Sequence, residues 1–470
     1  MKKYILIILC CLTSFPLWSY NVNMIVEHYS VDQGLPNNTV NCTLKDRDGF
    51  IWFGTWYGLC CFDGVKFKTF NKQEHDSDVP PRKIQRIVED KNGYIWVKTI
   101  DRKLYVFNKV TECFHAVYDD MKNYSENIQV IKLQNTAEGD VLLLTKDKNL
   151  LLAGVDEKGQ VTIKILFDSR NEINKHDYTL KHHVLCETEE YISWIGTDYK
   201  VSAVHKGAEL ASRPADFITS KINSGDKDSF TSFFEDGRKV WVGDRAGIFY
   251  SIDVRTGLVN RYVLSEIKGA ISNLLVTPAG YVYLSVAGQG TYEYDLAERR
   301  LQKINTEMND AMVTHAFIDQ YDKIWFHENE KALIYYDPLN HTAKRFPFTM
   351  FGKITTLYSE DAGERGLFFL SPAGEAWLFD REHAEMVYIN KLKQLSNDRA
   401  NQQFYHLMLD NDGVLWLSSA DEGVYCMNFP KKQFNLLSLS PQSAGQENYT
   451  IGVRALFQSK SGDIWVGTRW

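Results

Sequence analysis

The stretch Asp46–Thr55, D-R-D-G-F-I-W-F-G-T, decides how this chain folds, because variants of it recur along the whole sequence. Close copies begin at Asp90 (D-K-N-G-Y-I-W-V-K-T), Asp410 (D-N-D-G-V-L-W-L-S-S) and Ser459 (S-K-S-G-D-I-W-V-G-T). Each copy, which we call the kernel, reads as a turn followed by a strand that carries a tryptophan. A motif that returns at a nearly constant interval indicates a repeat architecture.

Weaker copies of the kernel keep the same register. The tryptophan position, which we call the anchor, recurs every 42 to 52 residues, and seven of the eleven tryptophans occupy it. The concentration of tryptophan at one position predicts that the anchor packs one repeat against the next. The ten anchors are Trp52, Trp96, Leu142, Trp194, Trp241, Tyr283, Trp325, Phe368, Trp416 and Trp465.

Each repeat predicts four strands. The alternating residues Val40, Cys42 and Leu44 before the first kernel are typical of a half-buried strand. The kernel aspartate can accept hydrogen bonds from the turn that follows, and the kernel glycine supplies a positive φ. The anchor strand is then followed by Gly58–Asp63 and Phe67–Phe70, which are rich in strand-forming residues. Four antiparallel strands per repeat, with a core shared between neighbouring repeats, indicate an all-β chain built as a β-propeller.

Ten repeats do not suit one ring. We predict a first, seven-bladed propeller at residues 21–350 and a partial second propeller of about three blades at 351–470, the last blade incomplete. Ile25–Tyr29 resembles a fourth strand without its own blade. It is expected to close a ring against the last blade, although the sequence does not indicate which ring.

The first twenty residues predict a signal peptide. Lys2 and Lys3 precede the apolar run Tyr4–Leu12, which is too short to span a membrane. We expect cleavage near Ser19 and a periplasmic location. A lipoprotein attached through Cys10 or Cys11, and an uncleaved anchor, are the alternatives.

Composition narrows the functions further. A chain of 470 residues that is 44% hydrophobic and 13% aromatic predicts a large core rather than disorder. The net charge of −7 and the lack of a basic stripe argue against a nucleic-acid partner. No cofactor or metal is predicted, because the adjacent pair His182 and His183 would point to opposite faces of a strand. The six cysteines outside the leader are predicted to fill strands rather than form disulfides.

Gln33–Gly64 resembles a known family. Its phrase G-L-P-N-N, the kernel and G-L-C-C-F-D-G together are similar to the first repeat of the periplasmic sensors of hybrid two-component systems, the regulator-propeller proteins of gut Bacteroidetes. In that family two seven-bladed propellers precede a β-sandwich, a membrane helix, a histidine kinase, a receiver and a helix-turn-helix regulator. The family senses glycan breakdown products and induces polysaccharide-utilisation genes.

The resemblance has consequences for this chain. It implies a glycan oligosaccharide as ligand, a homodimer in the complete receptor and no enzyme activity in these residues. Membrane attachment and kinase output would come from a C-terminal segment beyond Trp470, where the tenth repeat is interrupted. We therefore expect a fragment or a truncated gene product. A secreted propeller enzyme, lyase or glycosidase, and a non-functional remnant of a sensor gene are the alternative hypotheses.

The predicted ligand site lies on the turns between second and third strands. These turns share a face with the loops that lead into the next blade, and aromatic rings and planar hydrogen-bonding groups there suit a sugar. No catalytic residue is predicted. The candidate ligand-binding residues are Trp56, Tyr57, Arg102, Tyr199, Asp244 and Arg245.

Overall fold

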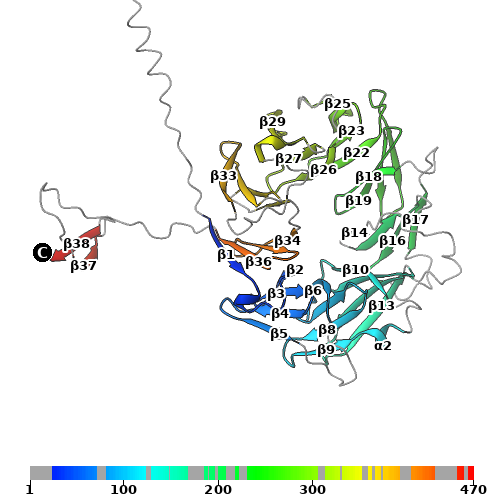
Figure 1. Cartoon of the computed structure of the whole chain (residues 1–470). Helices are drawn as coiled ribbons and strands as arrows, with labels where there is room; N and C mark the ends of the chain where they lie inside the picture. Colours follow the sequence, from blue (N-terminus) through cyan, green and yellow to red (C-terminus); the bar gives the residue numbers. More distant parts are fainter. Residues whose placement is uncertain are drawn as a thin grey trace, which may run out of the picture. The chain divides into compact units, whose positions relative to one another are not determined.

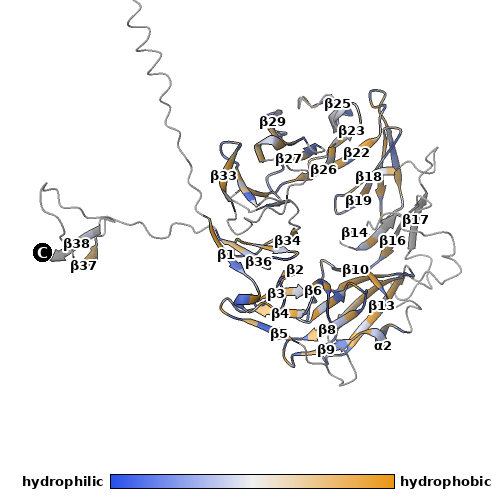
Figure 2. Ribbon diagram, viewed as in Figure 1, coloured by the Kyte–Doolittle hydropathy of each residue, from blue (hydrophilic) through white to orange (hydrophobic). Residues whose placement is uncertain are grey.

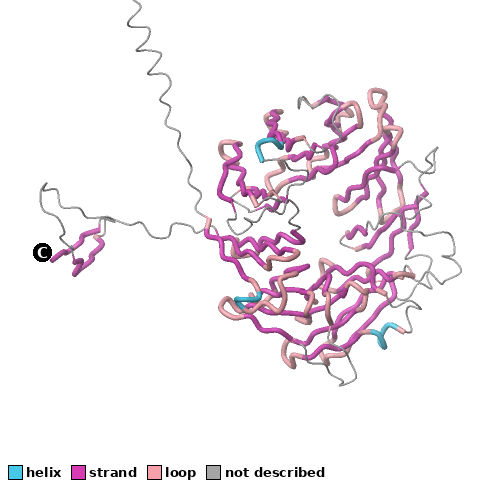
Figure 3. Tube along the Cα trace, in the orientation of Figure 1, coloured by secondary structure: helices cyan, strands magenta, loops and turns pink. Residues whose placement is uncertain are grey.

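The regular secondary structure of the computed structural model is almost entirely strand, with loops and turns between the strands (Figure 3). It describes residues 24–469 except 71–80, 123–128, 148, 168–184, 189, 196–199, 208–216, 222–229, 305–312, 329–330, 352–357, 362–365, 372–373, 392–403, 429–451 and 460–463. The predicted signal peptide therefore lies outside the described residues. The chain divides into two compact units, Met1–Phe429 and Pro430–Trp470.

The larger unit contains nine four-stranded antiparallel sheets (Figure 1). The first three are β2 (Val40–Lys45), β3 (Ile51–Thr55), β4 (Gly58–Phe62), β5 (Phe67–Phe70); β6 (Ile84–Glu89), β7 (Ile95–Thr99), β8 (Leu104–Asn108), β9 (Cys113–Ala116); and β10 (Val130–Asn135), β11 (Val141–Thr145), β12 (Leu150–Val155), β13 (Val161–Phe167). The next three are β14 (Leu185–Glu187), β15 (Tyr191–Ile195), β16 (Lys200–His205), β17 (Phe217–Lys221); β18 (Phe230–Glu235), β19 (Lys239–Asp244), β20 (Ile248–Asp253), β21 (Val259–Val263); and β22 (Ile271–Val276), β23 (Tyr281–Val286), β24 (Gly290–Asp295), β25 (Arg300–Lys303).

The last three sheets of this unit include the N-terminal strand. They are β26 (Val313–Ile318), β27 (Ile324–Glu328), β28 (Ala332–Asp337), β29 (Thr342–Pro347); β30 (Tyr358–Asp361), β31 (Leu367–Leu370), β32 (Glu375–Asp380), β33 (Glu385–Lys391); and β34 (Phe404–Leu409), β35 (Val414–Ser419), β36 (Val424–Asn428) with β1 (Ile25–Tyr29). Short helical segments are η1 (Val31–Gln33), α2 (Tyr118–Met121) and η4 (Phe348–Phe351). The smaller unit is a hairpin of β37 (Gly452–Gln458) and β38 (Ile464–Arg469).

The kernel aspartate and the anchor tryptophan form one hydrogen-bonded unit. Oδ1 of Asp46 accepts the backbone N–H groups of Asp48 and Phe50 at 3.0 and 2.9 Å, while Oδ2 accepts the indole N–H of Trp52 at 2.8 Å. One carboxylate therefore fixes both the turn and the ring that follows it. The same pair recurs as Asp90–Trp96, Asp236–Trp241, Asp319–Trp325 and Asp410–Trp416, with indole-to-carboxylate distances of 2.9, 2.7, 3.3 and 3.0 Å.

Where the anchor is not tryptophan, the turn residue changes with it. Thr136 precedes the anchor Leu142, and Thr277 precedes the anchor Tyr283; in both turns the threonine hydroxyl accepts the backbone N–H four residues on, at 3.1 and 3.2 Å. The hydroxyl of Tyr283 instead donates to buried Glu293 on the third strand at 2.9 Å. A hydroxyl therefore suffices to order the turn, as it also does at Thr188, which precedes the anchor Trp194 and accepts the N–H of Tyr191 at 3.0 Å. Where the turn residue is aspartate, its second oxygen can also accept the indole N–H.

The anchors pack neighbouring sheets together, as predicted. Trp52 lies 5.6 Å from Phe107 of the second sheet, measured between ring centroids, and Trp416 of the ninth sheet lies 5.9 Å from Phe53 of the first. A hydrophobic cluster spans each of the nine junctions between successive sheets, so the sheets close into a ring. Figure 2 shows the apolar residues concentrated on the strands. The β-propeller fold predicted from the repeats is therefore confirmed.

The division of the repeats differs from the predicted one. No break falls at residue 350 among the described residues, because Phe346, Phe351 and Phe369 belong to one buried cluster that crosses it. The larger unit instead ends at Phe429. Strand β1 supplies the reason: it pairs with β36, from Ile25 opposite Asn428 to Tyr29 opposite Val424, and completes the ninth sheet (Figure 1).

Three further features bear on the sequence predictions. No helix among the described residues is long and apolar enough to cross a membrane. The described cysteines Cys42, Cys60, Cys61, Cys113 and Cys426 carry free thiols. The tenth anchor, Trp465, is 66% exposed on the separate hairpin.

Replacing Asp90 with alanine should lower the free energy of unfolding by about 2–4 kcal/mol, because the indole of Trp96 and two turn N–H groups lose their acceptor. Urea unfolding followed by tryptophan fluorescence measures the change. Asp156→Ala is the matched control, since Asp156 also accepts two turn N–H groups but no indole. Equal losses in the two variants would contradict the role given to the indole bond.

Gly423→Ala should open the ring at β1. A Cβ at Gly423 would stand 2.2 Å from the carbonyl oxygen of Tyr29, whereas a Cβ at Gly280 meets nothing within 4 Å, although φ is +88° and +87° at these two glycines. Both variants carry backbone strain of about 1 kcal/mol. Only Gly423→Ala should also release β1 to limited proteolysis, as followed by mass spectrometry. Similar cleavage in Gly280→Ala would show that β1 does not depend on this contact.

Candidate functional site

The two rims of the ring carry different turns. The kernel turns join first and second strands at one rim, which we call the kernel face. The turns between second and third strands lie at the other end of the second strand, and we call that rim the opposite face. The chain enters the next sheet there, because the N–H of Lys83, just before β6, donates to the carbonyl of Trp56 at 2.9 Å. The face shared by turns and entering segments is thus confirmed for the first two sheets.

Trp56, Tyr57 and Arg102 come together on the opposite face. Trp56 and Tyr57 follow β3 and are 42% and 60% exposed, and Arg102 is exposed in the turn after β7. Backbone hydrogen bonds link these turns, since the N–H of Ile100 donates to the carbonyl of Lys83 at 2.9 Å. The two turns therefore belong to one continuous surface on the first and second sheets.

The other three candidates are placed differently. Arg245 is exposed but lies on the fifth sheet, apart from this surface. Asp244 is only 2% exposed; its carboxylate accepts the N–H groups of Ala246 and Ile248 at 2.9 and 2.8 Å, which assigns it to its own turn. Tyr199 lies outside the described residues.

Sequence reasoning missed two lysines on this surface. The ammonium of Lys83 lies 5.3 Å from the centroid of the Trp56 ring, a cation–π contact. Lys98 is 6% exposed and donates to Oε1 of Gln85 at 2.8 Å and to the carbonyl of Ile131 at 2.6 Å. Burial and the nearby charge of Arg102 lower the pKa of Lys98. The signal for Lys98 was present in the kernel, where I-W-V-K-T stands in place of I-W-F-G-T.

A cavity of about 430 Å³ adjoins Arg102. Its walls come from the turn after β7, from β8 and from the segment that follows β9. Two tyrosines and several polar groups line it, a composition that suits a small polyhydroxylated ligand. The lining residues that bear on binding are Asp101, Arg102, Lys103, Tyr105, Tyr118 and Gln129.

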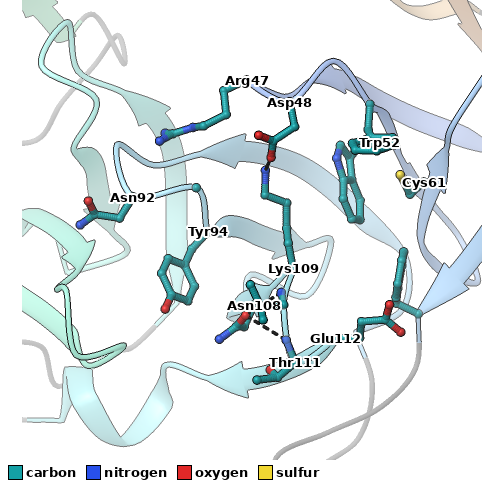
Figure 4. A pocket seen from close by; sticks show the side chains of 14 residues that line it. Arg47, Asp48, Trp52, Cys61, Asn92, Tyr94, Asn108, Lys109, Thr111 and Glu112 are labelled. Carbon is teal, nitrogen blue, oxygen red and sulfur yellow. Dashed lines mark hydrogen bonds and ion pairs between the residues drawn. The ribbon is translucent and has the colours of Figure 1, made fainter.

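A larger hollow of about 780 Å³ lies on the kernel face between the first and second sheets (Figure 4). Several of its polar side chains already form hydrogen bonds within the protein. Oδ1 of Asn108 accepts the N–H groups of Val110 and Thr111 at 2.8 and 3.1 Å. The side-chain amide of Asn92 donates to the carbonyl of Val155. Few polar groups therefore remain to orient a ligand in this hollow.

Three carboxylates in the same hollow have the spacing of a cation site. One oxygen each from Asp46, Asp48 and Glu89 lies within 4.8 Å of the others. The ammonium of Lys109 sits among them, 3.0 Å from Asp46, 2.6 Å from Asp48 and 2.8 Å from Glu89 (Figure 4). Burial alone would lower the pKa of Lys109, but the hydrogen bonds to these carboxylates raise it. A lysine thus supplies the cation that the carboxylates need.

This arrangement recurs at other junctions of the ring. Lys206 contacts Glu187 at 2.6 Å and Glu138 of the preceding sheet at 3.6 Å. Arg381 contacts Asp361 at 2.9 Å and the kernel Asp319 of the preceding sheet at 3.7 Å. Each cation directly follows a third strand and binds carboxylates of its own and the previous sheet. The kernel face is therefore an electrostatic clamp between sheets.

Lys109→Met should lower the free energy of unfolding by about 2–4 kcal/mol, because the buried carboxylate of Asp46 loses its cation, although Glu89 keeps its contact with Arg47 at 3.2 Å. Added Ca²⁺ should restore part of the stability of this variant and none in the wild type, as measured by thermal unfolding. Lys68→Met is the control, since its exposed pair with Glu112 contributes about 1 kcal/mol or less. Stabilisation of the wild type by Ca²⁺ would contradict the clamp and favour a metal site.

Comparison with solved structures finds propellers of low similarity. The extracellular domain described as part of the hybrid two-component system BT4673 from B. thetaiotaomicron matches at 14% identity and a TM-score of 0.37, over 93% of this chain and 69% of that chain. The corresponding domain of BT3049 from the same organism matches at 18% identity and a TM-score of 0.34, over 95% and 58%. Virginiamycin B lyase from Staphylococcus aureus matches at 12% identity and a TM-score of 0.40, over 63% and 93%.

These identities and TM-scores carry no conclusion about ligand or activity. No curated protein matches the sequence. The family described as "Two component regulator propeller" matches residues 34–57, which run from Gly34, just after η1, through the first kernel to Tyr57. This match covers the same residues on which the sequence resemblance rested. Residues 34–57 are therefore similar to a two-component regulator propeller repeat, and they contain β2 and β3 of the first sheet.

Proposed function

We propose that this chain is the extracytoplasmic ligand-sensing region of a hybrid two-component sensor and that it binds a glycan-derived oligosaccharide on the opposite face. The similarity of residues 34–57 to a regulator propeller repeat supports the sensor class. The observation that carries the ligand proposal is the exposed pair Trp56–Tyr57, whose turn is linked through the backbone of Lys83 to the turn that holds Arg102.

Trp56 is exposed on a fixed backbone. Its N–H donates to the carbonyl of Thr39 at 3.2 Å, and its carbonyl accepts the N–H of Lys83 at 2.9 Å. The hydroxyl of Thr55 accepts the N–H of Tyr57 at 3.1 Å and donates to the carbonyl of Gly58 at 2.8 Å. A large apolar ring held in solvent by such a turn loses little further freedom on binding, which favours stacking against a sugar.

The output of the sensor would lie outside these residues. We propose that ligand binding controls polysaccharide-utilisation genes through kinase and DNA-binding modules of a longer protein, acting in the periplasm as a homodimer. The closed ring supports this division of labour, because shared clusters and inter-sheet ion pairs make it a rigid body suited to carrying a binding face. The alternative of a propeller enzyme predicts product formation instead.

Trp56→Ala should weaken oligosaccharide binding about tenfold, because a stacking contact contributes roughly 1–1.5 kcal/mol. Isothermal titration of the full chain against a panel of defined oligosaccharides measures the affinity, and chromatography of the same samples reports any product. Phe50→Ala is the matched control, since Phe50 is also 42% exposed but lies on the kernel face.

Two results would contradict the proposal. Loss of binding in Phe50→Ala with unchanged binding in Trp56→Ala would place the ligand on the kernel face. Turnover of an oligosaccharide by the wild-type chain would favour the enzyme.

A further inference from the structure

Four basic side chains on the first two sheets lack acidic partners among the described residues. On the kernel face, Lys45, Lys109 and Arg381 each contact two or three carboxylates. On the opposite face, no described carboxylate lies within ion-pair distance of the four basic side chains that gather on the first two sheets. These are Lys83, Arg86, Lys98 and Arg102. Because the whole chain has a net charge of −7, its composition does not explain a cluster of four basic residues without acidic partners.

The one acidic residue at this point is already paired. Asp101 lies between the anchor strand β7 and Arg102, where its carboxylate accepts the hydroxyl of Thr99 and contacts the ammonium of Lys103 at 3.4 Å. Lys98 is bound by neutral acceptors only, the amide of Gln85 and a backbone carbonyl. The positive charge of this surface is thus left without an internal counter-charge.

Two of these cations are held at a conformational cost. Lys83 and Arg102 have φ of +49° and +69°, in the left-handed region that side chains other than glycine and asparagine rarely adopt. Arg102 closes its turn by donating its N–H to the carbonyl of Thr99, which is the bond that Gly247 makes to Asp244 on the fifth sheet. Arginine therefore stands where another repeat uses glycine. The same φ region occurs at Arg299, so the backbone alone does not mark a ligand site; what distinguishes Arg102 is its place beside the cavity.

The charges also converge in space. Arg86 lies opposite Lys98 in the pairing of β6 with β7. The charge of Arg102 adds to burial in lowering the pKa of Lys98, and Arg86 does the same for His406 on the ninth sheet. Lys83 lies over Trp56, and Arg102 with Lys103 lines the 430 Å³ cavity. An aromatic platform, a cavity and several uncompensated cations thus occupy one surface.

We propose that this surface selects an acidic oligosaccharide, one that carries carboxylate or sulfate groups, with Arg102 and Lys83 binding the anions while Trp56 stacks on a sugar ring. This inference rests on the proposed function and adds the ligand class. Guanidinium and ammonium groups form charge-assisted hydrogen bonds with carboxylate and sulfate oxygens, and a neutral sugar would leave the same cations uncompensated.

The test uses the full chain and three probes of equal length: an oligogalacturonate, a chondroitin sulfate oligosaccharide and a neutral xylo-oligosaccharide. Isothermal titration should show binding of at least one acidic probe, which weakens with rising salt, and at least tenfold weaker binding of the neutral probe. Comparison of the two acidic probes distinguishes carboxylate from sulfate recognition.

Arg102→Gly should lower the affinity for the acidic probe about tenfold without lowering the midpoint of thermal unfolding, because glycine relieves the backbone strain. Arg299→Gly is the matched control: Arg299 is an exposed arginine with φ +52° on the sixth sheet, and its loss should leave affinity unchanged. Equal binding of the neutral probe, or acidic binding indifferent to Arg102→Gly, would overturn the acidic ligand class while leaving the sensor proposal standing. Failure of all three probes to bind would overturn both.

Discussion

The bond between the kernel carboxylate and the anchor indole is the interaction on which this ring depends. In the first kernel, Asp46 orders the turn with one oxygen and holds the Trp52 indole with the other. The indole can then be buried without an unsatisfied N–H, and its ring packs against the next sheet. Because turn, strand and inter-sheet contact are fixed by one side chain, the sequence repeats this unit rather than separate signals for each.

The two rims of the ring follow from the same geometry. The kernel turns meet cations from the next sheet, and Lys109, Lys206 and Arg381 neutralise carboxylates there. The opposite rim has no kernel carboxylates, and Lys98 and Arg102 have no carboxylate partner among the described residues. The kernel rim stabilises the ring, whereas the turns of the opposite rim expose Trp56, Tyr57 and Arg102. Residues in the turns of the opposite rim can therefore differ between repeats without disrupting the contacts that hold the ring together.

The sequence predicted the repeating elements well because the kernel is local. All described anchors except the one on the separate hairpin lie on buried second strands, and the exposed turn with Trp56 and Tyr57 was found from its offset to the kernel. Three features escaped prediction because they depend on contacts between distant residues. Strand β1 could have closed either of two rings, and only its pairing with β36 decides. Asp244 has a side chain that could bind a ligand, but its carboxylate accepts two backbone N–H groups of the turn in which it lies. Lys83 and Lys98 were not predicted as site residues, because only the structure shows that Lys83 lies over Trp56 and that Lys98 is close to the charge of Arg102.

The division between a structural rim and a binding rim is tested most directly by hydrogen–deuterium exchange of the full chain with and without an acidic oligosaccharide. The account predicts that ligand slows exchange in peptides containing residues 55–58, 82–86 and 98–104. Peptides that contain the kernel turns at residues 46–50 and 90–94 should be unchanged. Slower exchange at the kernel turns, with none around Trp56 and Arg102, would contradict it.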